Sequence, residues 1–356
     1  MDVSKDQMTL LLDNGLYDSA QMLGCFLVSS SAANSENNPY MKAESLVLQG
    51  DALFGEKEFR RALSTYKQAL QHIKIIPKQA ATSRSSLSTS SRSSSPNSTN
   101  VSSINEYDVK FKITLCYCAL SENRAALAEM EGIPPKSRTL RMNLTMAKLL
   151  RISRHNRAAT TCYKDCLRHC PYVLEAIAAL AELGTSSKEI LSLLPQTPNR
   201  GRPPFDHLDT PRWLQRYVEA QCCIATNDYK GGLEHFCDLL QRFPNNIHIL
   251  LEIAKVEAII GRNEDAIMNF EKVRAIDPYV MTYMDEYAML LKAKSDHSKL
   301  NKLVHDLLHI DPGRAETYVA LSVLWERKDE RRALAYAEKS IRIDERHISG
   351  HIVKAR

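Results

Sequence analysis

Residues 261–278 read GRNEDAIMNFEKVRAIDP, and the same pattern returns further along the chain as SKLNKLVHDLLHIDP and again as ERRALAYAEKSIRIDE. The prolines Pro244, Pro278 and Pro312 follow one another at intervals of 34 residues. A fixed period of this length is typical of stacked helical hairpins, because each hairpin needs a neighbour to cover its apolar face. The sequence therefore predicts an all-α repeat array instead of a single globular core.

This 34-residue unit resembles the tetratricopeptide repeat. In a frame that begins at Ile247, the characteristic positions 15, 20, 24 and 32 hold Gly261, Ala266, Phe270 and Pro278. Glycine opens the turn between the two helices, alanine lets them approach closely, phenylalanine fills the space between them, and proline ends the second helix. We expect a tetratricopeptide-repeat solenoid, a right-handed superhelix of antiparallel helix pairs.

The same frame fits other parts of the chain. Further matches begin at Met1, Ala43, Leu140, Trp213, Met281 and Ala315. The match at Ala315 requires a one-residue deletion. The hairpin between residues 108 and 135 and the one after Leu174 match poorly, so we interpret both as degenerate repeats. One match is a weak signal, whereas a series of them is a strong one.

Two segments interrupt the array. The first is mostly Ser and Thr with almost nothing apolar to bury, so we expect a disordered insert, and the second holds enough Pro and Gly to exclude a helix. The predicted organisation is N-terminal hairpins that form a homodimer at 1–76, the Ser-rich insert at 77–105, degenerate and regular hairpins at 106–194, a Pro/Gly-rich linker at 195–211, a regular array at 212–347, and the start of a truncated further repeat at 348–356. We expect the complete form of the chain to continue the array.

Composition argues against several classes of partner. The chain has 356 residues, 44% of them hydrophobic, and a formal charge of only +5. No Lys/Arg stripe with interleaved aromatic residues is present, and no apolar run approaches the ~18–20 residues that cross a membrane, so we expect neither nucleic acid nor membrane as a partner. The N-terminus lacks a secretory signal. The chain has nine cysteines, and because this number is odd we expect them to be reduced thiols and not a disulfide framework. We expect the protein in the nucleus and cytoplasm, with the spindle as a further location.

The first hairpin, MTLLLDNGLYDSAQMLGCFLV at residues 8–28, is apolar on more faces than a second repeat can cover. Large exposed apolar surfaces usually mark association sites. We therefore predict a homodimer through this hairpin. The alternative is that the link at residues 29–39 folds back over it. The predicted contact residues are Met8, Leu11, Leu12, Leu16, Leu23, Phe26 and Leu27.

The sequence lacks the motifs of a catalytic or cofactor site. GDALFGEK at residues 50–57 has two glycines in phosphate-loop spacing, but Glu56 stands where the loop requires lysine. CYKDCLRHC at residues 162–170 places Cys162 and Cys166 on one helical face, which suits zinc, although structural zinc sites generally pair closer-spaced ligands from two segments. We expect no catalytic residue, no cofactor and no metal.

A helical array of this type binds partners along the first helices of its pairs, where certain positions point into an inner groove. The predicted groove residues are Arg141, Lys148, Arg151, Tyr217, Gln221, Lys255, Met289 and Lys292. The group of Arg141, Lys148 and Arg151 suits an acidic tail or a terminal carboxylate. The alternative is a solvated basic face. Lys148 has no asparagine companions at the places where a co-chaperone carboxylate clamp would need them.

Three stretches of the sequence match a known family more specifically than the generic repeat pattern does. Residues 11–29 (LLDNGLYDSAQMLGCFLVS), the Ser-rich insert and residues 235–281 closely resemble the family of subunit seven proteins of the anaphase-promoting complex, or cyclosome. The resemblance covers the whole chain apart from the final KAR. It implies a non-catalytic scaffold and adaptor of a multi-subunit ubiquitin ligase that acts in mitosis. It also implies an N-terminal homodimer, contacts with other tetratricopeptide subunits, and activator or substrate segments as further partners.

The alternative function is a free-standing peptide-binding adaptor such as a co-chaperone, and an enzyme ranks behind both. Purification distinguishes the first two, because a scaffold migrates in a very large assembly and an adaptor as a compact dimer. Ser95, Thr197 and Thr210 each precede a proline in a segment expected to be mobile, so we also predict mitotic phosphorylation at these residues.

Overall fold

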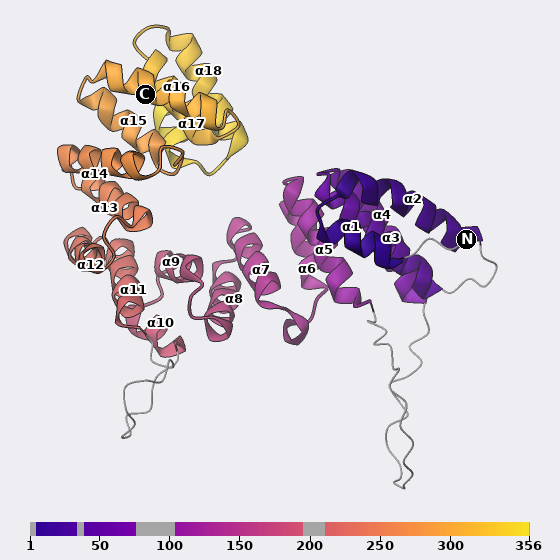
Figure 1. The fold of residues 1–356 in the computed structure, drawn as a ribbon. Coiled ribbons are helices and arrows are strands. Elements are labelled where there is room, and N and C mark those ends of the chain that lie inside the picture. Colours follow the sequence, from indigo (N-terminus) through magenta and orange to yellow (C-terminus); the bar gives the residue numbers. More distant parts are fainter. Residues whose placement is uncertain (1–4, 34–38, 76–103, 195–210, 356) are drawn as a thin grey trace, which may run out of the picture. The chain divides into compact units, whose positions relative to one another are not determined.

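The computed structural model describes residues 5–33, 39–75, 104–194 and 211–355 of the chain. Within these residues the chain forms nineteen α-helices, one short 3-10 helix at Pro135–Ser137 and no strand (Figure 1). The predicted all-α fold is confirmed. None of the described helices is both long enough and apolar enough to cross a membrane.

The helices follow one another as pairs joined by short turns, so the two helices of a pair run antiparallel. In chain order the pairs are α1 (Lys5–Asp13) and α2 (Tyr17–Ala33), α3 (Pro39–Gly55) and α4 (Phe59–Ile75), α5 (Glu106–Ala119) and α6 (Asn123–Glu131), α7 (Leu140–Ile152) and α8 (Asn156–His169), α9 (Leu174–Glu182) and α10 (Ser187–Leu193), α11 (Arg212–Ala225) and α12 (Tyr229–Arg242), α13 (Ile247–Ile259) and α14 (Asn263–Ile276), α15 (Met284–Ala293) and α16 (His297–Ile310), and α17 (Ala315–Trp325) and α18 (Glu330–Ile343). Helix α19 (Ile348–Ala355) follows the last pair. The two hairpins that match the repeat poorly, α5 with α6 and α9 with α10, are helix pairs as well.

A residue with positive φ lies in the turn of eight of these nine pairs. These residues are Gly15, Lys57, Ser121, Arg154, Gly184, Asn227, Gly261 and Ser295. A left-handed residue at this place ends the first helix, and glycine adopts it without steric cost. Because Asn227, Gly261 and Ser295 lie 34 residues apart, the turn keeps the sequence period even where the glycine is replaced. The described turn between α17 and α18 has no such residue, and there the sequence frame required a deletion.

The characteristic packing positions bring the helices of a pair close together. Gly50 of α3 faces the ring of Tyr66 on α4, and a Cβ atom at Gly50 would lie 2.4 Å from Cε1 of that ring. A larger residue fits there only if the ring moves. The Tyr66 hydroxyl donates a hydrogen bond of 2.6 Å to Oδ1 of Asp51. Phe270 of α14, at the same repeat position as Tyr66, is completely buried, as its position in the frame predicts.

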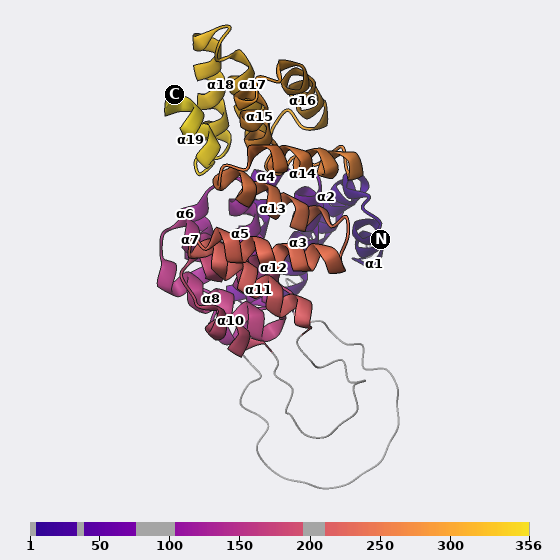
Figure 2. The ribbon, with the colours of Figure 1, turned by 90° about the vertical axis from the view of Figure 1, so that its left-hand side faces the viewer.

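The chain divides into two compact units, residues 1–176 and 177–356. Within each unit the core is spread along the helix pairs. In the first unit, one apolar cluster joins α1, α2 and α3, and another joins α3, α4 and α5. In the second unit, one cluster extends from α13 to α19. Figure 2 shows α17, α18 and α19, which pack on one another in that unit.

Several predictions fall on residues outside the described ranges. The Ser-rich insert at 77–105 and the linker at 195–211 lie almost entirely there, and so do the phosphorylation candidates Ser95, Thr197 and Thr210. The predicted domain boundaries and the right-handed superhelix stay predictions.

Candidate protein-interaction surfaces

The first hairpin uses most of its predicted contact residues in its own packing. Met8 of α1 and Leu27 of α2 are buried in a cluster with Ala20 and with Ala52 of α3. The other members of the predicted set that pack against this cluster are Leu11, Leu12 and Leu23. Since these side chains hold the hairpin on α3, Met8 and Leu27 are not available to a partner, and we withdraw both from the predicted dimer surface.

A smaller apolar surface of the hairpin reaches solvent. Leu16 is 53% exposed and Phe26 is 68% exposed. Leu10 and Met22 are also exposed, although they were absent from the predicted set. Met22 and Phe26 stand one turn apart on α2 and therefore share a face of that helix, a spacing that was readable in the sequence. We call Leu10, Leu16, Met22 and Phe26 the N-terminal apolar surface.

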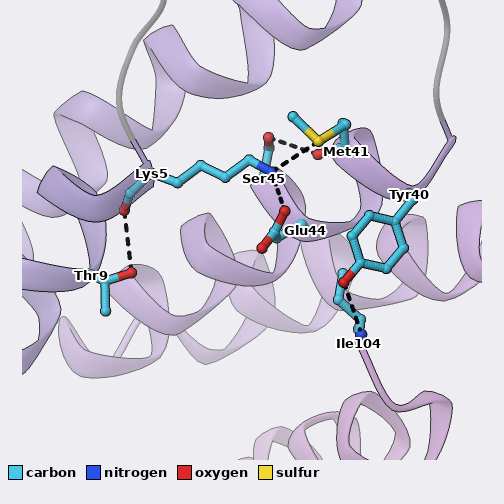
Figure 3. Close-up of polar contacts among 7 residues, drawn as sticks. All are labelled: Lys5, Thr9, Tyr40, Met41, Glu44, Ser45 and Ile104. Carbon is cyan, nitrogen blue, oxygen red and sulfur yellow. Dashed lines mark hydrogen bonds and ion pairs between the residues drawn. The ribbon is translucent and has the colours of Figure 1, made fainter. Parts of the chain in front are cut away.

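Polar contacts fasten the hairpin to α3 (Figure 3). The Lys5 ammonium of α1 forms an ion pair with Glu44 and lies 3.1 Å from the sulfur of Met41, both on α3. The backbone N–H of Ile104 donates a hydrogen bond of 3.3 Å to the hydroxyl of Tyr40, at the start of α3. Helix α3 therefore anchors both the preceding hairpin and the residue that leads into α5.

The predicted basic groove residues of the first unit already have partners. The Arg141 guanidinium lies over an aromatic ring of α5, 5.6 Å from its centre. Lys148 Nζ lies 2.5 Å from Oε2 of Glu175. Arg151 hydrogen-bonds the side chain of Tyr163. The predicted basic face is thus partly neutralised by the chain itself, although the half-exposed Lys148–Glu175 pair opens at little cost.

Arg141 also lines a cavity of about 530 Å³ between α3, α5 and α7. Among the lining residues, the Lys112 ammonium lies 2.5 Å and 2.6 Å from the two carboxylate oxygens of Asp51, which also accepts the hydrogen bond of Tyr66. Burial and the Asp51 charge raise the pKa of the Tyr66 hydroxyl, so this phenol stays protonated. These three groups satisfy one another and fix α3 against α5.

Two predicted groove residues of the second unit, Tyr217 and Gln221 of α11, are buried. The Gln221 amide donates a hydrogen bond of 3.2 Å to the Tyr217 hydroxyl, which lies 3.0 Å from Nε2 of His248 on α13. The Tyr217 ring also packs edge-on against Phe236 of α12, with ring centres 6.3 Å apart. Because these side chains join helix pairs inside the chain, we withdraw both from the binding groove.

The remaining predicted groove residues also contact the chain itself. The Lys255 ammonium donates to the Tyr283 hydroxyl at 3.3 Å, and that hydroxyl donates to Oε1 of Glu252 at 3.2 Å. Lys292 forms an ion pair with the glutamate directly after α17. Met289 is half-buried against the core cluster of the unit. The predicted groove positions are therefore occupied by side chains that bind one another.

A buried ion pair on α15 was missed in the sequence. Asp285 is 3% exposed, and its Oδ2 lies 2.9 Å from Nε2 of His347, just before α19. Burial opposes the charge of Asp285, but its contacts with His347 and Ser349 lower its pKa overall, and the contact with Asp285 raises the pKa of His347. Burial and the Asp285 charge raise the pKa of Glu286 to about 7. Acidic residues are ordinary at the start of a helix, so no sequence signal marked this pair.

The two motifs considered for ligands take structural positions. Gly50 and Gly55 lie within α3, so GDALFGEK forms no phosphate-binding loop. Cys162 and Cys166 are buried in α8, and burial raises the pKa of the Cys166 thiol to about 12. Over the described ranges, no group of three or more His, Cys, Asp or Glu residues is arranged to hold a metal ion.

Comparison with known proteins shows which proteins are similar to this chain over nearly its whole length. No family model matches it. The Anaphase-promoting complex subunit 7 of Arabidopsis thaliana is 62% identical over 356 residues, which cover 99% of this chain and 63% of the relative. The protein of the same name from Homo sapiens is 30% identical over 348 residues, which cover 96% of this chain and 59% of the relative. The chain thus spans about three-fifths of the length of these curated relatives.

A solved structure supports the fold. The crystal structure of the APC/C hetero-tetramer Cut9-Hcn1 contains a chain that matches with a TM-score of 0.55 at 16% sequence identity, over 99% of this chain and 62% of that chain. Identity this low shows the fold alone, which is the predicted array of tetratricopeptide helix pairs. The relationship rests instead on the 62% identity along nearly the whole sequence. The chain is therefore a tetratricopeptide-repeat homologue of the proteins named Anaphase-promoting complex subunit 7.

Proposed function

We propose that the chain is a non-catalytic scaffold and adaptor subunit of the anaphase-promoting complex, a multi-subunit ubiquitin ligase that controls progress through mitosis. The observation that carries this proposal is the 62% identity over 99% of the chain to the plant protein named as a subunit of that complex. The matched region extends over all the described helix pairs.

The polar side chains of the described helices support a non-catalytic role. A catalytic site needs polar groups that converge on a substrate and keep hydrogen-bonding capacity for it. Along the first helices of the pairs, Tyr217 instead contacts His248, and Lys255 contacts Tyr283. Rigid helix pairs with extended surfaces suit the positioning of other proteins.

The N-terminal apolar surface is the place where we expect the chain to contact a second copy of itself. Leu16 and Phe26 leave most of their apolar area in water, and removal of such area from water is favourable by about 25 cal/mol per Å² before the costs of association. Other tetratricopeptide subunits of the ligase, and activator or substrate segments, are the further partners in this proposal. Location in the nucleus and cytoplasm and at the spindle, and phosphorylation of Ser95, Thr197 and Thr210, belong to the same mitotic role.

Affinity capture of the tagged full chain from mitotic extract, followed by mass spectrometry, tests the proposal. We expect the capture to return the other ligase subunits, including those that carry catalysis. Capture of chaperones or short peptides without any ligase subunit would contradict the scaffold function and favour the free-standing adaptor.

A further inference from the structure

A cavity of about 510 Å³ lies in the second unit between α14 and α16, the second helices of their pairs, and reaches Tyr287 of α15. Its volume falls within the range of about 300–1,000 Å³ that is usual for ligand pockets. Its polar lining residues are Glu271, Arg274, Tyr287, Lys299, Lys302 and Asp306. None of them belongs to the networks of the first helices described above.

Two hydrogen-bond donors of this cavity have no acceptor within the described part of the chain. Tyr287 is 4% exposed, and its ring packs on Phe270 with ring centres 5.3 Å apart, but its hydroxyl makes no hydrogen bond. Arg274 binds Asp306 through Nη2 at 2.5 Å, whereas its Nη1 is buried without a partner. A buried donor without an acceptor is unfavourable, and this applies to Nη1 of Arg274. The Tyr287 hydroxyl is not buried in this way and offers a second, accessible donor to an incoming acceptor.

One cation that lines the cavity has no carboxylate partner among the described residues. Arg274 pairs with Asp306 at 2.5 Å, and Lys299 Nζ lies 2.7 Å from Oε1 of Glu271. Lys302 is exposed and forms no ion pair with any described residue. Lys299 Nζ also lies 3.7 Å from Oδ2 of Asp296, so among the described residues Lys302 is the lining cation that has no carboxylate partner.

The rest of the lining is apolar and consists of Ala275, Pro278 and Leu303. A ligand that fits must bring hydrogen-bond acceptors, one negative charge and some apolar surface. A carboxylate next to an aliphatic side chain has all three. A phosphate monoester carries about −1.5 to −2 charges and would leave excess negative charge beside Glu271 and Asp306.

We propose that the cavity between α14 and α16 binds an acidic peptide segment of a partner protein. One glutamate or aspartate carboxylate accepts hydrogen bonds from Tyr287 and Arg274 and pairs with Lys302, and an aliphatic neighbour of that acid lies against Leu303. This assignment goes beyond the scaffold function, since it names a surface on the second helices and the chemistry of its ligand. It holds whether or not the chain assembles into the ligase.

Fluorescence anisotropy of the full chain with three short labelled peptides tests the assignment. Each peptide carries one central residue between two leucines, flanked by Gly-Ser linkers, and the central residue is glutamate, glutamine or phosphoserine. We expect the glutamate peptide to bind, and the glutamine peptide to bind on the order of tenfold more weakly, because hydrogen bonds to a charged group are about twice as strong as neutral ones.

Two variants locate the binding. Lys302→Gln removes the unpaired ammonium, and Tyr287→Phe removes the hydroxyl while it keeps the ring that packs on Phe270. Each should weaken binding of the glutamate peptide by roughly five- to tenfold, with an unchanged helical circular dichroism spectrum. Lys272→Gln, an exposed lysine of α14 outside the cavity, is the matched control and should leave the affinity unchanged.

Each contrary result overturns a defined part of the proposal. Absence of binding of the glutamate peptide at millimolar protein overturns the site. Equal affinities for the glutamate and glutamine peptides, or an unchanged affinity in Lys302→Gln, overturn recognition of a carboxylate at this cavity. Tighter binding of the phosphoserine peptide than of the glutamate peptide overturns the choice of an acidic segment in favour of a phosphorylated one.

Discussion

Nε2 of His347 lies 2.9 Å from Oδ2 of Asp285, and this contact joins the start of α19 to α15. Asp285 is almost completely buried, so its charge depends on His347 and on the hydrogen bond from Ser349. Loss of the imidazole proton leaves a buried carboxylate with a weaker partner, which is unfavourable. Helix α19 is therefore held by a contact whose strength depends on pH.

We predict that α19 loosens as the pH rises past neutrality. The contact with Asp285 raises the pKa of His347 above its ordinary 6.5, and Glu316 and Asp344 act in the same direction. The stabilisation is complete below pH 6.5 and is lost as the pH rises through the folded pKa. Burial raises the pKa of Glu286 from 4.5 to about 7, so stability also declines over that interval. Hydrogen exchange of the α19 amides, corrected for the intrinsic rate, should be faster at about pH 8 than at about pH 6.

The variant His347→Gln separates this contact from the contribution of Glu286. Glutamine retains a hydrogen-bond donor but does not titrate, so protection of α19 should be lower than in the wild type at about pH 6 and should change less with pH. Equal protection of the wild-type helix at both pH values would show that the contact does not hold α19.

We predict that Phe270→Ala destabilises the second unit strongly. Phe270 is fully buried in the cluster that extends from α13 to α19, and it packs on Tyr287. Removal of a buried phenylalanine side chain costs about 3–5 kcal/mol in the free energy of unfolding. Met268→Ala, on the same helix but half exposed, is the control and should cost far less. Urea unfolding followed by circular dichroism measures both, and equal losses would place Phe270 outside the core.

We predict that Gly50→Ala destabilises the first unit by about 1–3 kcal/mol, because the new Cβ lies 2.4 Å from Cε1 of Tyr66 and forces the ring to move. The cost should be smaller in a Tyr66→Leu background, where no ring faces residue 50. A double-mutant cycle of unfolding free energies gives the coupling. Additive effects would contradict the close approach of α3 and α4.

We predict that Phe26→Glu abolishes self-association, since it places a charge in the centre of an apolar contact. The wild type should sediment as a dimer at micromolar concentration and the variant as a monomer of unchanged helicity. Leu334→Glu, a partly exposed residue of α18, is the matched control and should remain dimeric. A wild-type chain that stays monomeric over the whole concentration range would contradict the predicted homodimer.

The period of the sequence was sufficient to predict the fold. Ser295 and Asn227 keep the left-handed turn of Gly261 at the same interval, so the helix pairs could be placed from spacing alone. Spacing also predicted the burial of Phe270. Local signals of this kind are repeated in most of the pairs, and each repeat strengthens the others.

The interaction surfaces were less predictable, for a physical reason. Repeat position shows which side of a helix a residue occupies, but not which neighbour fills the adjacent space. Tyr217 and Gln221 occupy groove positions and are nevertheless buried by their contact with each other and with His248. Met8 and Phe26 are equally apolar, and only the packing of α1 and α2 on α3 shows that the first is core and the second is surface.

Sedimentation of a mitotic extract through a density gradient tests the central claim most directly, with the tagged full chain and the catalytic subunits of the ubiquitin ligase detected in each fraction. The account predicts that the chain co-migrates with those subunits in the heaviest fractions and leaves them when the complex is dissociated by salt. A chain found only in the light fractions of a free monomer or dimer, while the ligase remains heavy, would contradict the scaffold function.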